Sequence, residues 1–399
     1  MITILLVAAA LFLHEHLIQH PPLKHIVYIA IPSSALHATL SPPDASPFIK
    51  YANAFLSVAY VIRAVELLLV YDLRQLKRAE RTSPSTPYIW HPIPRTLGLD
   101  RIRYTSDLLI NPRGIGWSYV PAYSPPQPDS NNVGTRAFFL KHLLKLFTTY
   151  LLFDLHQATF GHNFPSVAVA IHSATSRVSI QLTPATTADL ARHYLLGPAC
   201  WLAAYAFIDG CHALVALVHG VLLAAAPAPE PWAWMYPPLF RSPRAMLTCR
   251  LRDIWGRMWH DLCRRPLLAT SLPLVPGGMS GPAKRLLVLL VSFAVSGCVH
   301  AAGAYAVSGG AYGAGVMVVF FVVMAGCIVL QEVLALGVQR ALGGCGCVRG
   351  MVRWCCDAVV LVGWAYWTCP WFIRYSMMPE AIASVPVLDI WGRMYNLSY

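Results

Sequence analysis

Long apolar segments separated by shorter polar or basic segments follow one another along most of the chain. A helix needs ~20 mainly apolar residues to cross the hydrocarbon core of a bilayer, so each long segment predicts a transmembrane helix. The pattern therefore predicts an all-α, polytopic membrane protein with about eight transmembrane helices. The expected crossings are residues 1–18, 24–40, 50–70, 137–160, 190–226, 285–308, 311–336 and 354–376.

Two of these segments need interpretation before they are counted. Residues 1–18 lack a basic start and a clear small-residue cleavage site, so we expect a retained helix rather than a signal peptide. Residues 190–226 are too few for three passes, so we expect one long, tilted or broken helix.

The composition agrees with a membrane protein. Hydrophobic residues make up 56% of the chain and charged residues 12%, whereas soluble globular chains carry about 25% charged residues. An ordinary soluble domain and a disordered chain are excluded on this ground. The eleven cysteines form no secreted disulfide pattern. For the cluster Cys345, Cys347, Cys355 and Cys356, palmitoylation, a metal and reduced thiols remain open alternatives.

The charge is unevenly distributed and predicts an orientation. The 30 Lys and Arg exceed the 18 Asp and Glu and concentrate in segments 71–136, 227–284 and 337–353. By the positive-inside rule these loops are cytosolic, which places segment 161–189 and the N-terminus in the lumen. Basic loops then face anionic headgroups, and no signature indicates nucleic acid. We expect a single membrane domain over 1–399, with interfacial helices in loops 71–136 and 227–284, in the endoplasmic reticulum.

An aromatic and basic segment, LRDIWGRMWHDLCRRP at 251–266, carries the first candidate chemistry. We expect an amphipathic helix that lies in the membrane interface. A guanidinium group gives a phosphate two parallel hydrogen bonds, so the segment is suited to an anionic, partly apolar ligand such as coenzyme A. A surface helix with snorkelling arginines is the alternative. The motif DIWGRM recurs at 389–394 and predicts a second interfacial helix.

His300 carries the second candidate chemistry. It stands alone in the otherwise uncharged segment 286–307, ~24 Å along the helix from Lys284 at ~1.5 Å per residue. Such a residue normally faces the protein interior or a wet cavity. Small neighbours (Ser296, Gly297, Ala301, Ala302, Gly303) allow a helix or substrate to approach closely. We expect a neutral imidazole that acts as a general base on an alcohol; a structural histidine bonded to a neighbouring helix is the alternative.

A third segment, NPRGIGWSYVPAY at 111–123, contributes a weaker signal. Gly114 and Gly116 let the backbone approach a ligand or another segment closely, and Arg113 is a possible phosphate contact.

Taken in order, RGIGW, then R-D-x-W-G-R-x-W-H, then S-G-x-x-H resemble the wax synthase-like acyltransferases of fungi and plants, which are related to the membrane-bound O-acyltransferases. The resemblance implies transfer of an acyl group from acyl-CoA to a hydroxyl, with acyl-CoA as a co-substrate and no permanent cofactor or metal. Fungal members imply acetyl-CoA and a hydrophobic alcohol such as a terpenoid; plant members imply a long-chain wax ester. His300 is implied as the base and His260 as a second catalytic or orienting residue. The donor-binding residues we expect are Arg252, Trp255, Arg257, Trp259, Arg264 and Arg265.

Three other classes of protein were weighed against this hypothesis. A di-iron oxygenase needs several histidine boxes, and no HxxHH occurs despite fifteen histidines. A transporter is favoured by paired broken helices, which the pattern lacks, although Arg63 and Glu66 stand inside one crossing. We interpret these two as an intrahelical pair near the cytosolic end. A membrane scaffold without activity would tolerate the loss of His300.

Overall fold

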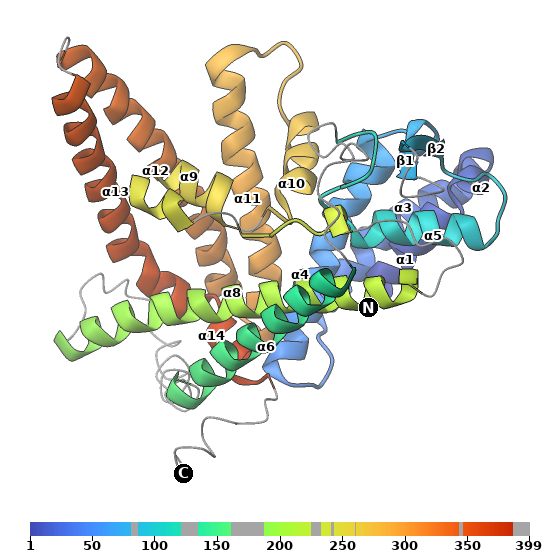
Figure 1. Ribbon diagram of the computed structural model, residues 1–399, viewed down its shortest axis with the longest axis horizontal. Coiled ribbons are helices and arrows are strands. Elements are labelled where there is room, and N and C mark those ends of the chain that lie inside the picture. The colour runs from blue at the N-terminus through green and yellow to red at the C-terminus, as the bar shows by residue number, and fades with distance from the viewer. Residues whose placement is uncertain are drawn as a thin grey trace.

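A computed structural model shows a protein built almost entirely of helices (Figure 1). The all-α fold predicted from the apolar pattern is confirmed. The structure describes residues 1–80, 87–120, 135–160, 187–224, 233–240, 243–259, 261–342 and 346–385.

Four long helices form an upright bundle around the candidate site. They are α4 (Pro47–Ala64, continued by the π-helical η1, Val65–Val70), α11 (Gly281–Ser308), α12 (Ala311–Ala341) and α13 (Gly346–Tyr375). In Figure 1, α11 and α12 diverge upward from a short turn at their lower end, and α13 returns beside α12. The turn at Gly309 adopts φ +66°, a left-handed conformation that glycine accepts without strain.

Two further long helices run across the lower part of this bundle. These are α6 (Thr135–Phe160) and α8 (Thr187–Ala224), which pack along each other, and α8 also contacts α13 (Figure 1). The prediction that residues 190–226 form one helix is confirmed, since α8 continues through Pro198. The short helix α14 (Met378–Ala383) packs against α4 and α8.

The N-terminal region forms a separate core beside the bundle. Its hydrophobic cluster includes Leu11, Leu67, Leu108 and Trp117, drawn from segments far apart in the sequence. We expected segment 71–136 to be a loop with interfacial helices; its described part contains one helix and also a two-stranded antiparallel sheet, which we did not expect. The elements are α1 (Ile2–Phe12), α2 (His14–Gln19), α3 (Pro21–Leu40), η2 (Leu73–Gln75), β1 (Lys77–Glu80), β2 (Ile89–Pro92) and α5 (Leu99–Ile110).

Short elements connect α8 to α11. They are the 3₁₀ turns η5 (Ala233–Met235) and η6 (Pro243–Thr248), then α9 (Leu251–Asp253), the π-helical η7 (Ile254–Met258), α10 (Arg264–Ser271) and the 3₁₀ turn η8 (Leu272–Leu274).

Within the described residues, five helices are long and apolar enough to cross a membrane: Pro47–Val70, Pro198–Val221, Gly281–Ser308, Ala311–Ala341 and Gly346–Ile373. The predicted count of eight is therefore not confirmed. The first predicted crossing is interrupted at Leu13, between α1 and α2. The segments predicted at 24–40 and 137–160 are helical but do not meet the same criterion of length and hydropathy.

The helix ends next to two predicted cytosolic segments, 227–284 and 337–353, lie at the same end of the bundle. The start of α11, the end of α12 and the start of α13 lie at the upper end of Figure 1, and the turn between α11 and α12 lies at the lower end. This arrangement agrees with the predicted sidedness, which requires segments 227–284 and 337–353 to share one face.

Candidate active site

His300 lies on α11 with its ring held by three side chains from two neighbouring helices. Its Nδ1 lies 3.2 Å from the hydroxyl oxygen of Tyr51 on α4. The Phe321 ring on α12 stacks on the imidazole with 4.7 Å between ring centroids. Phe55 on α4 meets it edge-on at 5.0 Å. A histidine at this depth is expected to face protein, and this one does.

Glycines on α11 allow α4 and α12 to pack closely against it next to His300. A Cβ added at Gly303 would lie 2.8 Å from the Tyr51 ring, and one added at Gly297 would lie 2.8 Å from the Cα of Val318 on α12. The prediction that small residues around His300 admit close neighbours is confirmed. The neighbours are a helix backbone and the ring of Tyr51.

The segment 251–266 does not form the single amphipathic helix that we expected. After one turn of α9 the chain enters a π-helical turn, closed by a 2.7 Å bond from the Trp259 amide to the Ile254 carbonyl. Trp259 is extended, and a new helix, α10, begins at Arg264. The Arg264 guanidinium donates to the Gly256 carbonyl at 3.3 Å. In a continuous helix this carbonyl would accept from a backbone amide one turn later.

Polar side chains of the bundle anchor the start of this segment. Gln331 on α12 accepts from the Leu251 amide at 2.8 Å and donates to the carbonyls of Cys249 and Asp357, each at 2.9 Å. Asp357 on α13 is buried and pairs with Arg250 at 3.3 Å. A buried amide that makes all three bonds fixes the position of α9 between α12 and α13.

Aromatic rings connect η7 to the histidine. The ring centroids of Trp255 and Phe321 are 6.5 Å apart, and Phe321 in turn stacks on His300. The Nε1 of Trp255 is buried and has no hydrogen-bond partner among the described residues. We call this set the aromatic cluster; its members are Trp201, Phe240, Trp255, Trp259, Phe293, Phe321 and Phe372. Two segments that the sequence analysis treated separately thus form one site.

The expected donor-binding arginines fall into two groups. Arg252 is exposed (64%) and pairs with Glu332 at 3.3 Å, and Arg264 is likewise at the surface. Arg265 instead donates to the Tyr71 hydroxyl at 2.8 Å and to the Tyr119 carbonyl at 3.1 Å. His260 and the side chain of Arg257 lie outside the described residues, as do Cys345 and the second DIWGRM motif.

Arg113, a possible phosphate contact, makes an internal ion pair. Its Nε lies 2.9 Å from Asp261 Oδ1, and its Nη1 donates to the Pro237 carbonyl at 2.8 Å. Arg113 therefore joins the RGIGW segment to the segment that follows η7. At Gly116, φ is +82° and the Trp234 ring lies 3.3 Å from the position of an added Cβ, so the loop requires glycine there.

A cysteine next to this ion pair is not activated. Burial raises the pKa of Cys263 to about 11, so its thiol stays protonated at neutral pH. A nucleophilic role for Cys263 is therefore disfavoured.

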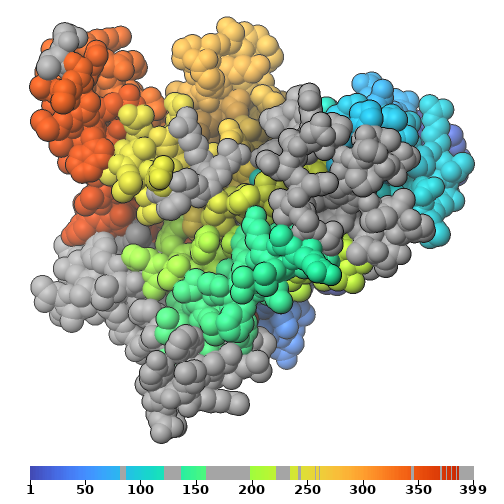
Figure 2. Space-filling model, viewed as in Figure 1, coloured from blue at the N-terminus to red at the C-terminus, as the bar shows by residue number. Residues whose placement is uncertain are grey.

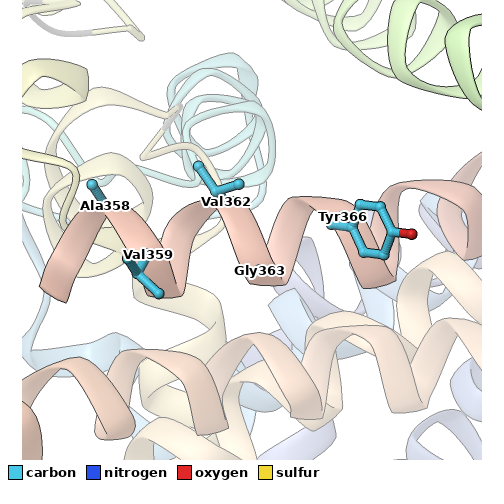
Figure 3. A pocket seen from close by; sticks show the side chains of 5 residues that line it. All are labelled: Ala358, Val359, Val362, Gly363 and Tyr366. Atoms are coloured by element: carbon cyan, nitrogen blue, oxygen red, sulfur yellow. The ribbon is translucent and has the colours of Figure 1, made fainter. Parts of the chain in front are cut away.

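The space-filling view shows a hollow between α10–α11 and α12–α13, with η6 and α9, in yellow, at its base (Figure 2). A separate apolar depression of about 460 Å³ lies on α13, lined by Ala358, Val359, Val362, Gly363 and Tyr366 (Figure 3). None of the residues lining that depression belongs to the aromatic cluster.

Five residues of the site were not predicted from the sequence: Tyr51, Phe55, Phe321, Gln331 and Asp357. Only Gln331 and Asp357 carried a usable signal, because polar residues inside apolar helices are costly and normally have a partner. Tyr51 and the two phenylalanines are ordinary residues of apolar helices, and their roles come from packing.

Comparisons with known proteins show what the chain resembles. Residues 236–323, which contain both the DIWGRMW segment and His300, match the membrane bound O-acyl transferase family. The chain is 24% identical over 370 residues to the O-mevalon transferase yanI of Aspergillus niger, covering 86% of this chain and 76% of that protein. It is 28% identical over 302 residues to the acetyltransferase ple2 of Rhodocybe pseudopiperita, covering 72% and 70%. A shorter match of 172 residues, also 28% identical, links it to the acetyltransferase aurG of Calcarisporium arbuscula and covers 41% and 39%.

The matched region and these relatives indicate an O-acyltransferase enzyme that is similar to the fungal transferases. The resemblance inferred from its three motifs is confirmed. No solved structure matches the chain. In this acyltransferase the matched region supplies α11, part of α12 and the segment that packs on them, which are the elements around His300.

Proposed function

We propose that this enzyme transfers an acetyl group from acetyl-CoA to the hydroxyl of a hydrophobic acceptor such as a terpenoid alcohol. Two relatives are named acetyltransferases, which supports an acetyl donor. The apolar, ring-lined surroundings of His300 support an apolar acceptor. A long-chain wax ester is the alternative product. We further propose that the enzyme resides in the endoplasmic reticulum, with the basic loops in the cytosol.

The proposed chemistry uses His300 as a general base. The acceptor hydroxyl gives its proton to the imidazole while its oxygen attacks the thioester carbonyl carbon. The tetrahedral intermediate then collapses, the C–S bond breaks, and the CoA thiolate takes the proton from the imidazolium. A positioned base contributes ~10²–10⁴-fold to such a step.

The donor is proposed to enter along the hollow of Figure 2, with its phosphates at the basic segment. Arg252 and Arg264 are at the surface, and their guanidinium groups are suited to phosphate oxygens. Arg257 is proposed to act with them. Trp255 and Trp259 are suited to line the path of the thioester, and the unpaired indole N–H of Trp255 is a donor available to its carbonyl oxygen. We keep His260 as a second candidate for stabilising that oxygen.

Arg265 is also proposed to contribute to binding of the acyl donor, but by holding the start of α10 in place. Its bonds to Tyr71 and Tyr119 hold the start of α10, next to Arg264. Its positive charge therefore remains near the proposed phosphate site while its donors are used inside the protein.

One observation supports the proposal. His300 lies in the region that matches the family, bonds to Tyr51 and stacks on Phe321 of the aromatic cluster. The chemistry needs a base beside an apolar space, and these contacts provide the residue types for it.

Membranes from a host that expresses the chain test the function. With acetyl-CoA and a panel of hydrophobic alcohols, we expect release of free thiol and an ester product detected by mass spectrometry. His300→Ala should lower the rate by at least ~10²-fold without changing the amount of protein in the membrane. The matched control is His37→Ala, because His37 is an exposed histidine on α3. Retained activity in His300→Ala would refute the assignment, and preference for palmitoyl-CoA would select the wax-ester alternative.

A further inference from the structure

We propose that Tyr51 is a positioning residue for the reaction: its hydroxyl holds Nδ1 of His300 so that Nε2 faces the reactants. This inference rests on the proposed function of His300. Tyr51 lies 249 positions before His300, on a different helix, and nothing in the local sequence marks it.

The contact is built into the packing of two helices. Tyr51 is 8% exposed, and His300 is its hydrogen-bond partner among the described residues. The Tyr51 ring lies against the open face of Gly303, three residues beyond His300 on α11. Phe55, one turn further along α4, stacks near Tyr51 with 5.9 Å between centroids and meets the imidazole edge-on. The hydroxyl therefore has little freedom to leave Nδ1.

The same contacts fix the orientation of the imidazole ring. Phe321 covers one face of the imidazole and Phe55 lies at its edge. With Tyr51 at Nδ1, Nε2 lies on the other side of the five-membered ring. A catalytic histidine is generally oriented by a third group bonded to its second nitrogen, and Tyr51 fills that place with a neutral hydroxyl.

A phenol suits the proton transfer because it has both a proton and two lone pairs. When Nε2 takes the proton of the acceptor alcohol, Nδ1–H donates to the Tyr51 oxygen and the imidazolium is stabilised. The proton then leaves with the CoA thiolate, and the bond returns to its neutral form. Hydrogen bonds to an ionised group are stronger than those to a neutral one, so the contact favours the charged ring formed during the reaction.

Steady-state kinetics of Tyr51→Phe test the inference. The substitution removes the hydroxyl but keeps the ring against Gly303 and Phe55. We expect kcat to fall ~10- to 100-fold, the value of one hydrogen bond to a charged group, with the KM for acetyl-CoA within about twofold of the parent. The control is Tyr312→Phe, which removes a hydroxyl from an exposed tyrosine at the start of α12.

Two further variants separate this inference from the proposed function. In a His300→Ala background, Tyr51→Phe should cause no further loss, because there is no ring to position. If Tyr51→Phe does not accumulate in membranes, Gly303→Ala replaces it, since the added Cβ displaces the Tyr51 ring but leaves its hydroxyl present. Loss of activity in His300→Ala with a parental kcat in Tyr51→Phe would overturn the positioning role and leave the function standing. A raised acetyl-CoA KM at unchanged kcat would also overturn it.

Discussion

The N-terminal region and the His300 site are held together by different forces. In the first, buried arginines bond to carboxylates and backbone carbonyls: Arg63 pairs with Glu66 and donates to the carbonyls of Leu108 and Asn111. In the second, aromatic rings pack on one another and His300 bonds to the hydroxyl of Tyr51.

The two regions therefore differ in how they use arginine. An arginine with several fixed acceptors positions segments that are distant in sequence, as Arg101 does with the carbonyls of Phe12 and Pro94. Such a group is already fully engaged within the protein. A site that must admit a substrate instead needs apolar surfaces and few fixed partners. Arginine alone is thus no indicator of phosphate binding here.

The largest expected effect is on the buried ion pair of the N-terminal region. Arg63→Ala leaves Glu66, which is fully buried, without its closest cation. Breaking one partner of a buried pair costs ~3–5 kcal/mol, and we expect a matching loss of stability against heat in detergent. Arg74→Ala is the control, because the pair Arg74–Asp72 lies at the surface. Equal melting of the two variants would contradict a structural role for Arg63.

A second, smaller effect is expected where the site is anchored to the bundle. Gln331→Leu leaves the Leu251 amide and the carbonyls of Cys249 and Asp357 without this partner. An unsatisfied buried polar group costs ~1–3 kcal/mol. Because η7 carries Trp255 of the aromatic cluster, activity should fall further than the amount of folded protein. Unaltered specific activity would show that the anchor does not position η7.

Close packing beside His300 gives a third test. Gly303→Ala places a methyl group 2.8 Å from the Tyr51 ring, whereas Gly326→Ala on α12 adds one where no atom lies within 4 Å. We expect ~1–3 kcal/mol of destabilisation and reduced turnover for the first. The second should be neutral or slightly stabilising, since alanine favours helix. Melting curves and turnover of the two variants, measured side by side, check the contrast.

The smallest effects are expected at the exposed arginines. Arg252→Ala should raise the KM for acetyl-CoA ~2- to 10-fold with kcat and stability unchanged, the value of one solvent-accessible charged contact. Arg265→Ala should lower stability as well, because its donors hold Tyr71 and Tyr119. If Arg252→Ala changed only the acceptor KM, the donor site would lie elsewhere.

Much of the site was predictable from local pattern. An isolated histidine with small neighbours in an apolar crossing indicated a packed interior position, and the contacts of Gly297 and Gly303 confirm it. The conformation predicted for the DIWGRMW segment was wrong. Its expected helix is replaced by a π-helical turn and an extended Trp259. Helical periodicity describes only local bonding, while here Gln331 and the Arg113–Asp261 pair fix both ends from other helices and loops.

The sequence by itself determined the helical membrane architecture and the acyltransferase resemblance, and it indicated His300 as a candidate base, because each rests on apolar segments or short motifs that are local in the chain. Only the tertiary structure decided which groups surround that histidine and which arginines are already engaged. Tyr51 and His300 are 249 positions apart, and Arg113 and Asp261 are 148 apart. Contacts at such separations follow from how whole helices pack, and the packing of a helix depends on shapes that no local pattern records.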